Sequence, residues 1–361
     1  MTVIVVQQAI NGVVLGSLYV LVALGLTLIY GVLVQINFAH ADFVTIGAFA
    51  AYFLMHLIGA NYLASIAVAL LVGGLCGFLI NAAVFTPLRS SRSELLPLIA
   101  TIGVSVMLQN VMLAWLGPIP YAFETPYSNQ VIRIASIFLT WQSVIIIAVA
   151  ATTIALLYAF MKFTFLGKAL RAVSQDRETA GLMGINANHL IMLTFVIASA
   201  LAGMAGAMLA PVLVLTPFAG TSVIVKAFAI VIIGGFGNVE GTILAGLIVG
   251  LIESFTTQYL DPGLIDIVVF GLLLLMLAIK PTGLISERRE ENVSVRRAAS
   301  PRARGRLDVV TQNVAVARCA GDRDPAAPVA RRLLADQPHH LCDQRAARAR
   351  ARFHLRLCRS A

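Results

Sequence analysis

The first 285 residues of this 361-residue chain contain very few charged side chains. They hold nine lysines and arginines and nine aspartates and glutamates, so this stretch has no formal net charge. Over the whole chain 59% of residues are hydrophobic and only 12% are charged. A single soluble core cannot bury that much apolar surface. The composition therefore excludes an ordinary soluble domain and indicates lipid as the solvent.

Cysteine and catalytic motifs are also scarce here. Cys76 is the only cysteine before residue 286, so no disulfide framework can be argued for the membrane part. The membrane part has no pair of His and Cys residues at metal-ligand spacing, no G-x-S-x-G elbow and no H-E-x-x-H motif. The glycine-rich stretch 234–241 lacks the Lys-Ser/Thr of a phosphate-binding loop, so we interpret it as a tight connection. We expect no enzyme, cofactor site or metal site in this chain.

Long apolar runs fill the chain to residue 279. A spanning helix needs about 20 mostly apolar residues, and the sequence predicts about nine membrane segments. Their approximate bounds are 9–33, 41–58, 61–85, 95–116, 139–161, 189–213, 218–235, 240–258 and 263–279. The seventh is short enough to be re-entrant. The expected fold is therefore an all-α, polytopic transmembrane helical bundle of about eight or nine segments.

The few basic residues predict the orientation, because cytoplasmic loops are enriched in lysine and arginine. Three connections hold most of them: Arg89 and Arg92 after the third segment, Lys162, Lys168, Arg171 and Arg177 after the fifth, and Lys280 after the ninth. We therefore expect a multi-pass protein with its amino terminus outside and its carboxyl terminus in the cytoplasm. An even number of passes would place both termini on the same side and break this agreement among the three basic connections.

The longest polar passage of the membrane part is 162–190, which this orientation places in the cytoplasm. Within it Glu178, Thr179, Ala180 and Gly184 form the pattern E-T-A-x-x-x-G. A short helix that ends at a glycine suits a C-cap. Lying parallel to the membrane, such a helix could dock in a groove of a cytoplasmic partner. A solvated amphipathic loop is the alternative.

Polar residues open the second segment, where Asn37, His40 and Asp42 lie at or inside the membrane boundary. Intramembrane polar groups are costly and indicate a functional site by default. On a helix, Asn37 and His40 would share a face. A broken helix start here would offer backbone donors to a translocation path or an adjacent subunit. Helix capping and bonding between neighbouring helices are the alternatives.

Lys226, Glu253 and Asp266 are the remaining charges in or near the late segments. We interpret Lys226 and Glu253 as interhelical or interfacial partners rather than as substrate ligands.

Small residues recur on the helices, and they favour close bundle packing over a glycine-lined pore. These glycines are Gly12, Gly16, Gly25, Gly31, Gly203, Gly206, Gly241, Gly246 and Gly250.

Six stretches, taken in their order and spacing, resemble one family. They are 7–31, 36–43, 99–110, 167–186, 226–246 and 280–284. Together they resemble the permease subunits of bacterial branched-chain amino acid ABC transporters, of the LivH type. The resemblance implies an ATP-driven importer of branched-chain or other hydrophobic amino acids in the bacterial cytoplasmic (inner) membrane. It also implies a second related permease, two ATP-binding subunits that hold ATP and Mg, and a periplasmic substrate-binding protein, with no nucleic acid.

The resemblance also supports coupling through the 162–190 loop. Permeases of ABC importers contact their ATPases through an E-A-A-x-x-x-G-like pattern, from which Thr179 departs. We assign ATPase coupling to Arg171, Glu178, Thr179, Ala180 and Gly184. In the second segment the family pattern N-F-A-H-G-[DE] has Ala41 in place of glycine. The translocation path or subunit interface is assigned to Asn37, His40, Asp42, Lys226 and Glu253.

Two alternatives stay open. Related permeases for urea or short amides would share these motifs. An autonomous carrier or channel that needs no ATPase would require ion-coupling carboxylates deep in the bundle, for which Asp42, Glu253 and Asp266 are the candidates.

The tail, residues 286–361, differs in composition from the 1–285 permease domain. It has seventeen arginines, no lysine, many alanines and prolines, and three of the four cysteines. GC-rich DNA read in the wrong frame would produce this mixture, so we interpret the tail as a frameshift or readthrough product. An Arg-rich tail on anionic lipid is the alternative, and in either case we expect disorder.

Overall fold

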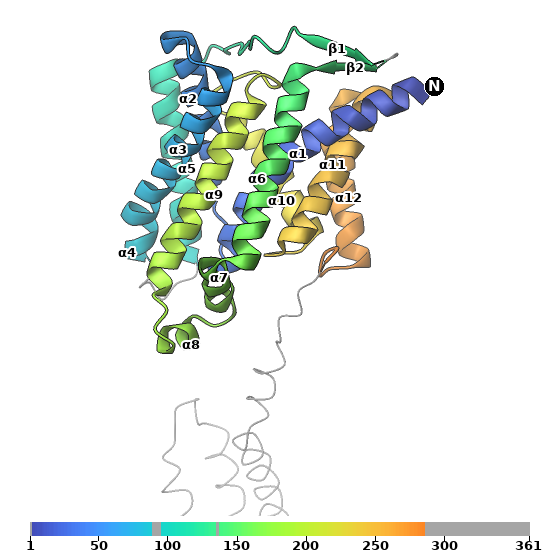
Figure 1. The fold of residues 1–361 in the computed structure, drawn as a ribbon. Coiled ribbons are helices and arrows are strands. Elements are labelled where there is room, and N and C mark those ends of the chain that lie inside the picture. Colours follow the sequence, from blue (N-terminus) through green and yellow to red (C-terminus); the bar gives the residue numbers. More distant parts are fainter. Residues whose placement is uncertain (1, 89–94, 135–136, 286–361) are drawn as a thin grey trace, which may run out of the picture. The chain divides into compact units, whose positions relative to one another are not determined.

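A computed structural model describes residues 2–88, 95–134 and 137–285 of the chain, and over these ranges it is a helical bundle (Figure 1). The helices are α1 (Thr2–Leu33), α2 (His40–Ile58), α3 (Tyr62–Ile80), α4 (Thr86–Leu88), α5 (Leu95–Leu116), α6 (Trp141–Phe163), α7 (Phe165–Gln175), α8 (Arg177–Leu182), α9 (Ala187–Leu209), α10 (Ala219–Gly234), α11 (Val239–Tyr259) and α12 (Ile265–Ile279). Eight helical segments of the described part are long and apolar enough to cross a membrane. The expected all-α, polytopic fold is confirmed.

One helix is central and several are peripheral. In an 18-residue apolar stretch of α1, 89% of the residues are buried, whereas only 6% are buried in the segment Pro262–Ile279, which contains α12. The buried share is also low in α5 (28%) and α6 (17%), so these helices and α12 lie at the periphery of the bundle. The tail and the arginines at 89 and 92 lie outside the described residues.

The third predicted segment is continuous but irregular. A π-helical turn, η1 (Asn81–Phe85), joins α3 to α4. Pro87 lies two residues after this turn, in α4, and it has no N–H to donate to the preceding turn, which is a common cause of a distorted helix. The whole segment Tyr62–Leu88 still qualifies as one membrane span.

The seventh predicted segment is α10, whose 16 residues make it shorter than a full span. It begins soon after Leu215, which pairs with Tyr121 in an isolated β-bridge. Its last turn accepts backbone hydrogen bonds from Leu284 and Ile285, which follow α12. Helix α10 is therefore attached at its last turn to the backbone that follows α12, and it is not one of the eight segments long enough to cross a membrane.

A β-hairpin occupies the connection before α6, where we predicted no strands. Strand β1 (Val131–Ile134) pairs antiparallel with β2 (Ile137–Thr140), and both are rich in β-branched residues. The side chain of Gln7 bonds both backbone groups of Phe138, at 2.8 and 3.0 Å. The hairpin and the start of α1 thus lie at one end of the bundle, and α7 and α8 lie at the other (Figure 1).

Glycine makes the closest helix contacts. A β-carbon on Gly47 of α2 would overlap the backbone of Gly203 on α9, and one on Gly246 would meet Val20 of α1. These glycines therefore serve bundle packing, as the sequence favoured. The connection 235–238 is tight as predicted, with φ of 105° at Gly235, a value that favours glycine.

Candidate functional site

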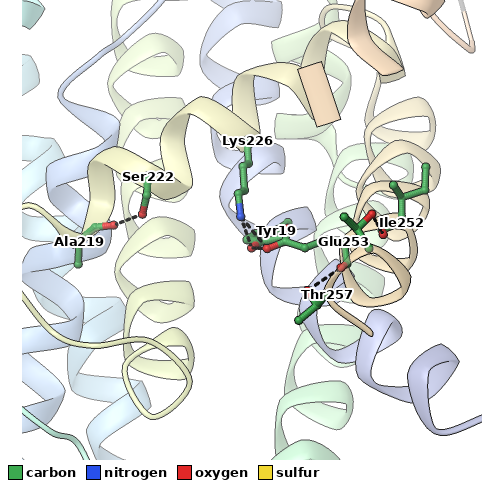
Figure 2. Close-up of polar contacts among 8 residues, drawn as sticks. Tyr19, Ala219, Ser222, Lys226, Ile252, Glu253 and Thr257 are labelled. Carbon is green, nitrogen blue, oxygen red and sulfur yellow. Dashed lines mark hydrogen bonds and ion pairs between the residues drawn. The ribbon is translucent and has the colours of Figure 1, made fainter. Parts of the chain in front are cut away.

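Three helices bring a polar cluster together inside the bundle. Lys226 Nζ of α10 lies 2.6 Å from Glu253 Oε1 of α11. Tyr19 Oη of α1 donates to the same Oε1 at 3.1 Å and accepts from Lys226 Nζ at 3.3 Å. Figure 2 shows Lys226 reaching from α10 toward the other two side chains. We call Tyr19, Lys226 and Glu253 the charge cluster.

Helix geometry explains why Tyr19 and Glu253 meet. Helices α1 and α11 pack antiparallel, with Gly12 against Leu251 and Gly16 against Leu247. Long side chains on a helix lean toward its N-terminus. On antiparallel neighbours they therefore lean toward each other.

The charge cluster is buried, but one of its polar atoms has no hydrogen-bond partner. The exposed fractions of the Lys226 and Glu253 side chains are 15% and 9%. Within the described residues, the ion pair and hydrogen bonds of the carboxylate fall on Oε1, and Oε2 is buried without a hydrogen-bond partner. Such groups are expensive in a low-dielectric interior, so an unmatched carboxylate oxygen calls for a further partner.

A second polar region lies at the start of α2. The chain leaves α1 at Leu33, and Val34 adopts a φ of 55°. Residues 34–39 are not helical, and α2 begins at His40. Asn37 therefore lies before the helix, and the prediction that it shares a helical face with His40 is wrong. A broken connection, which the sequence did suggest, is present.

The backbone donors at this helix start are already engaged. Asn37 Oδ1 accepts from the N–H of Ala39 at 3.1 Å, and Thr101 Oγ1 accepts from that of Phe38 at 3.4 Å. Ala41 is buried in the first turn of α2 and has no positive φ. Alanine therefore fits where the family pattern has glycine, and the N–H groups of this turn do not point to an open anion site.

His40 is fully buried between helices. Its Nε2 lies 3.2 Å from the carbonyl of Val22, and its Nδ1 has no hydrogen-bond partner. A β-carbon on Gly25 would lie 2.6 Å from the ring, so that glycine leaves the space that the ring occupies. His40 thus packs against α1.

Asp42 faces a different helix. Gln109 Nε2 of α5 donates to Asp42 Oδ1 at 3.0 Å and also contacts Ser105 Oγ at 3.1 Å. Asp42 is 2% exposed, and Oδ2 has no partner. Within the described residues no lysine or arginine pairs with it. His40 and Asp42 do not form one site.

The predicted coupling loop contains two helices, α7 and α8. Asp176 caps α8: its Oδ1 accepts from the N–H groups of Glu178 and Thr179, at 2.9 and 3.0 Å. The hydroxyl of Thr179 donates to the other carboxylate oxygen at 2.6 Å. The residue that departs from the family pattern thus stabilises the helix start.

Gly184 ends α8 as the sequence predicted. It has a φ of 82°, and its N–H donates to the carbonyl of Gly181 at 3.0 Å while that of Ile185 donates to Ala180 at 3.1 Å. These are the two bonds of a Schellman motif. Ala180 and Ile185 pack in one apolar cluster with Leu170, so the loop is a defined structure.

The tip of this loop is apolar and open. Leu182 and Met183 are 88% and 78% exposed, and they lie beside the exposed Glu178. Arg171 is also exposed, whereas Ala180 is buried beneath the tip. Large apolar side chains gathered at such a tip suit contact with another protein.

The family model described as branched-chain amino acid transport system / permease component matches residues 8–277. The chain belongs to this family. The permease protein LivH of the high-affinity branched-chain amino acid transport system of Salmonella typhimurium is 34% identical over 305 residues, which cover 80% of this chain and 97% of LivH. The LivH of Escherichia coli strain K12 has the same identity and coverage. BraD of Pseudomonas aeruginosa, a permease protein of the same kind of system, is 33% identical over 300 residues, again 80% and 97% of the two chains. No solved structure matches the chain.

The permease thus holds its candidate site residues in three separate places. Lys226 and Glu253 are in contact, as interhelical partners should be, while Asp42 and the α8 tip lie elsewhere. Sequence reasoning missed Tyr19 and Gln109, which contact the charged residues. Both are uncharged residues in long apolar runs, and only the helix arrangement identifies their partners. Across the described residues, no group of three His, Cys, Asp or Glu side chains could hold a metal ion.

Proposed function

We propose that this permease is the membrane-spanning subunit of an ATP-driven importer that carries branched-chain or other hydrophobic amino acids across a bacterial cytoplasmic membrane. The observation that carries the proposal is 34% identity that extends over 97% of LivH. The relatives described above are named for branched-chain amino acids, so a urea or short-amide substrate is not favoured. The chain itself performs no bond chemistry.

The partners in this proposal are a second related permease, two ATP-binding subunits and a periplasmic substrate-binding protein. ATP and Mg belong to the ATP-binding subunits. The capped helix α8 supports the contact with an ATPase, because it presents Leu182 and Met183 on a rigid, solvent-exposed support. A helix tip of this kind can enter a groove and transmit its movement. Arg171 and Glu178 supply charge beside it.

This assignment places α7 and α8 in the cytoplasm and the amino terminus outside. Lys162, Lys168 and Arg171 then lie on the cytoplasmic side, in agreement with the distribution of basic residues in membrane proteins. The β1–β2 hairpin and the segment around Tyr121 would face the substrate-binding protein.

The test of the coupling contact uses the double variant Leu182→Asp/Met183→Asp in the complete complex. We expect normal membrane insertion, loss of the ATP-binding subunits on purification and loss of uptake. The matched control is Leu260→Asp, because Leu260 is 55% exposed but follows α11 at the opposite end. Retention of the ATPases and of uptake in the double variant would refute the contact.

A reconstitution test separates this function from an autonomous carrier or channel. Proteoliposomes with both permeases, both ATPases and the binding protein should accumulate leucine only when ATP is inside the compartment that contains the ATPases. Omission of the ATPases should abolish accumulation. If uptake persists without the ATPases, the proposed function is wrong and the chain is an autonomous carrier or channel.

A further inference from the structure

The charge cluster has bonding capacity that its own three side chains leave unused. A lysine ammonium has three donors, and Lys226 uses them toward two atoms, Glu253 Oε1 and Tyr19 Oη. Glu253 Oε2 accepts nothing within the described part of the chain. An ion pair that served only to join two helices would gain from engaging both carboxylate oxygens. Here one donor position of Lys226 and one acceptor oxygen of Glu253 are left over.

The cluster adjoins an exposed face of α10. Ser222 lies one turn before Lys226 on the same face and is exposed, with its hydroxyl bonded to Ala219 of its own helix (Figure 2). Val225 next to Lys226 is 40% exposed. A ligand approaching this face would meet a small polar group, an apolar side chain and then the charges.

We propose that the charge cluster binds the charged end of a zwitterionic amino acid. The ligand carboxylate would accept from Lys226 Nζ, and its ammonium would donate to Glu253 Oε2. Its apolar side chain would lie along the face of α10 that contains Val225. This inference rests on the proposed function, because it takes the transported solute to be an amino acid.

The electrostatics of the bilayer favour this arrangement. A single charge in the membrane interior is costly, but Lys226 and Glu253 neutralise each other when no ligand is bound. A zwitterion adds one positive and one negative charge, so its binding leaves the net charge of the site unchanged. Removing either charge from the ligand would leave one protein charge partly unmatched. The cluster should therefore discriminate against leucinamide, which lacks the carboxylate, and against 4-methylpentanoate, which lacks the ammonium.

Asp42 does not offer the same chemistry. It is a buried carboxylate whose contacts are the neutral Gln109 and its neighbour Ser105 and which has no described cationic partner. A zwitterion there would find no group for its carboxylate. The charge cluster is thus the better match for both ends of an amino acid.

The experiment measures protection of a cysteine placed beside the cluster. In the complete complex, Ser222→Cys is introduced after replacing Cys76, Cys319, Cys342 and Cys358 by serine. The rate of modification by a hydrophilic thiol reagent is then measured with leucine, leucinamide or 4-methylpentanoate. We expect leucine to slow modification about tenfold at about ten times its dissociation constant. The two analogues at the same concentration should leave the rate unchanged.

Two variants distinguish a ligand-binding site from an ion pair that only holds two helices together. Glu253→Gln should lose protection by leucine. The exchange Lys226→Glu/Glu253→Lys keeps an interhelical ion pair and should recover thermal stability relative to Glu253→Gln, but it reverses the two charges and should not restore protection. Protection that survives in Glu253→Gln, or equal protection by leucinamide, would overturn the proposal.

Uptake measured on the same Ser222→Cys complex keeps the two proposals apart. If leucine is transported but does not protect the cysteine, the ligand site is wrong and the proposed function stands. If the complete complex transports no leucine, the proposed function fails, and the protection rates still decide whether the cluster binds a zwitterion.

Discussion

Gly16 of α1 and Gly250 of α11 pack backbone to backbone, and a β-carbon on Gly250 would overlap the N and Cα atoms of Gly16. Helices in lipid associate through such close contacts because no hydrophobic drive brings them together. Tyr19 lies three residues after Gly16, and Glu253 three residues after Gly250. The glycine contact therefore sets the distance across which these two side chains bond.

Gly250→Ala should destabilise the permease more than Gly271→Ala. The first substitution overfills a contact between α1 and α11, at a cost of about 1–3 kcal/mol. The second places a methyl group where nothing lies within 4 Å. Thermal unfolding of the two purified variants gives the comparison. Equal melting temperatures would mean that the α1–α11 contact adjusts without cost.

Gly184→Ala should disturb the end of α8, whereas Gly181→Ala should not. Neither added β-carbon meets a neighbour within 4 Å, and only Gly184 has a positive φ. The expected strain is about 1 kcal/mol. We expect Gly184→Ala, and more strongly Gly184→Val, to lower the ATP hydrolysis that is coupled to uptake while insertion stays normal. Coupling that is unaffected by Gly184→Val would count against α8 as the contact.

Asp176→Ala should loosen the first turn of α8. The side chain of Asp176 caps two N–H groups and accepts from Thr179, and loss of an N-cap costs about 0.5–2 kcal/mol. Amide hydrogen exchange at Glu178 and Thr179 should become faster. Ser174→Ala is the control, because its hydroxyl donates to the carbonyl of Arg171 in its own helix, α7. Similar exchange in both variants would show that the cap does not hold the helix.

Gln109→Leu should destabilise the permease by about 1–3 kcal/mol, because it leaves the buried Asp42 without its amide donor. The double variant Asp42→Leu/Gln109→Leu removes both polar partners and should recover part of that loss. A double-mutant cycle of thermal stabilities measures the coupling between the two residues. Additive effects would indicate that the 3.0 Å contact contributes nothing.

Removal of residues 292–361 should leave transport intact. The family match ends at residue 277, and the tail differs in composition from everything before it. Leucine uptake by the shortened and full-length permeases, at matched levels in the membrane, tests this. A marked loss of uptake in the shortened form would show that the tail has a role.

Hydropathy predicted most of the fold because each helix must be apolar along its length to lie in lipid. The segment 95–116 has the bounds of α5, and 240–258 differs from α11 by one residue at each end. The β1–β2 hairpin could not be found this way, because β1 lies in a proline-containing connection and the end of β2 falls inside the predicted membrane segment 139–161. The shared helical face of Asn37 and His40 was predicted wrongly, because spacing alone assumes an unbroken helix.

The candidate site was only partly accessible from the sequence. Rare charges in apolar runs identified Lys226 and Glu253 as functional candidates, since such groups are costly in lipid. Their pairing with each other, and with Tyr19, depends on how α1, α10 and α11 cross. The role of Thr179 was likewise hidden, because its partner Asp176 precedes the motif that drew attention to it.

The backbone after α12 bonds to the last turn of α10, with Leu284 N–H 2.8 Å from the carbonyl of Ile233. Residues 284 and 285 are therefore attached to the helix that contains Lys226. A fluorophore or spin label placed there would report on the movement of α10, from the side of the membrane where α7 and α8 lie. Such a label would let the timing of helix movement be compared with ATP hydrolysis during a transport cycle.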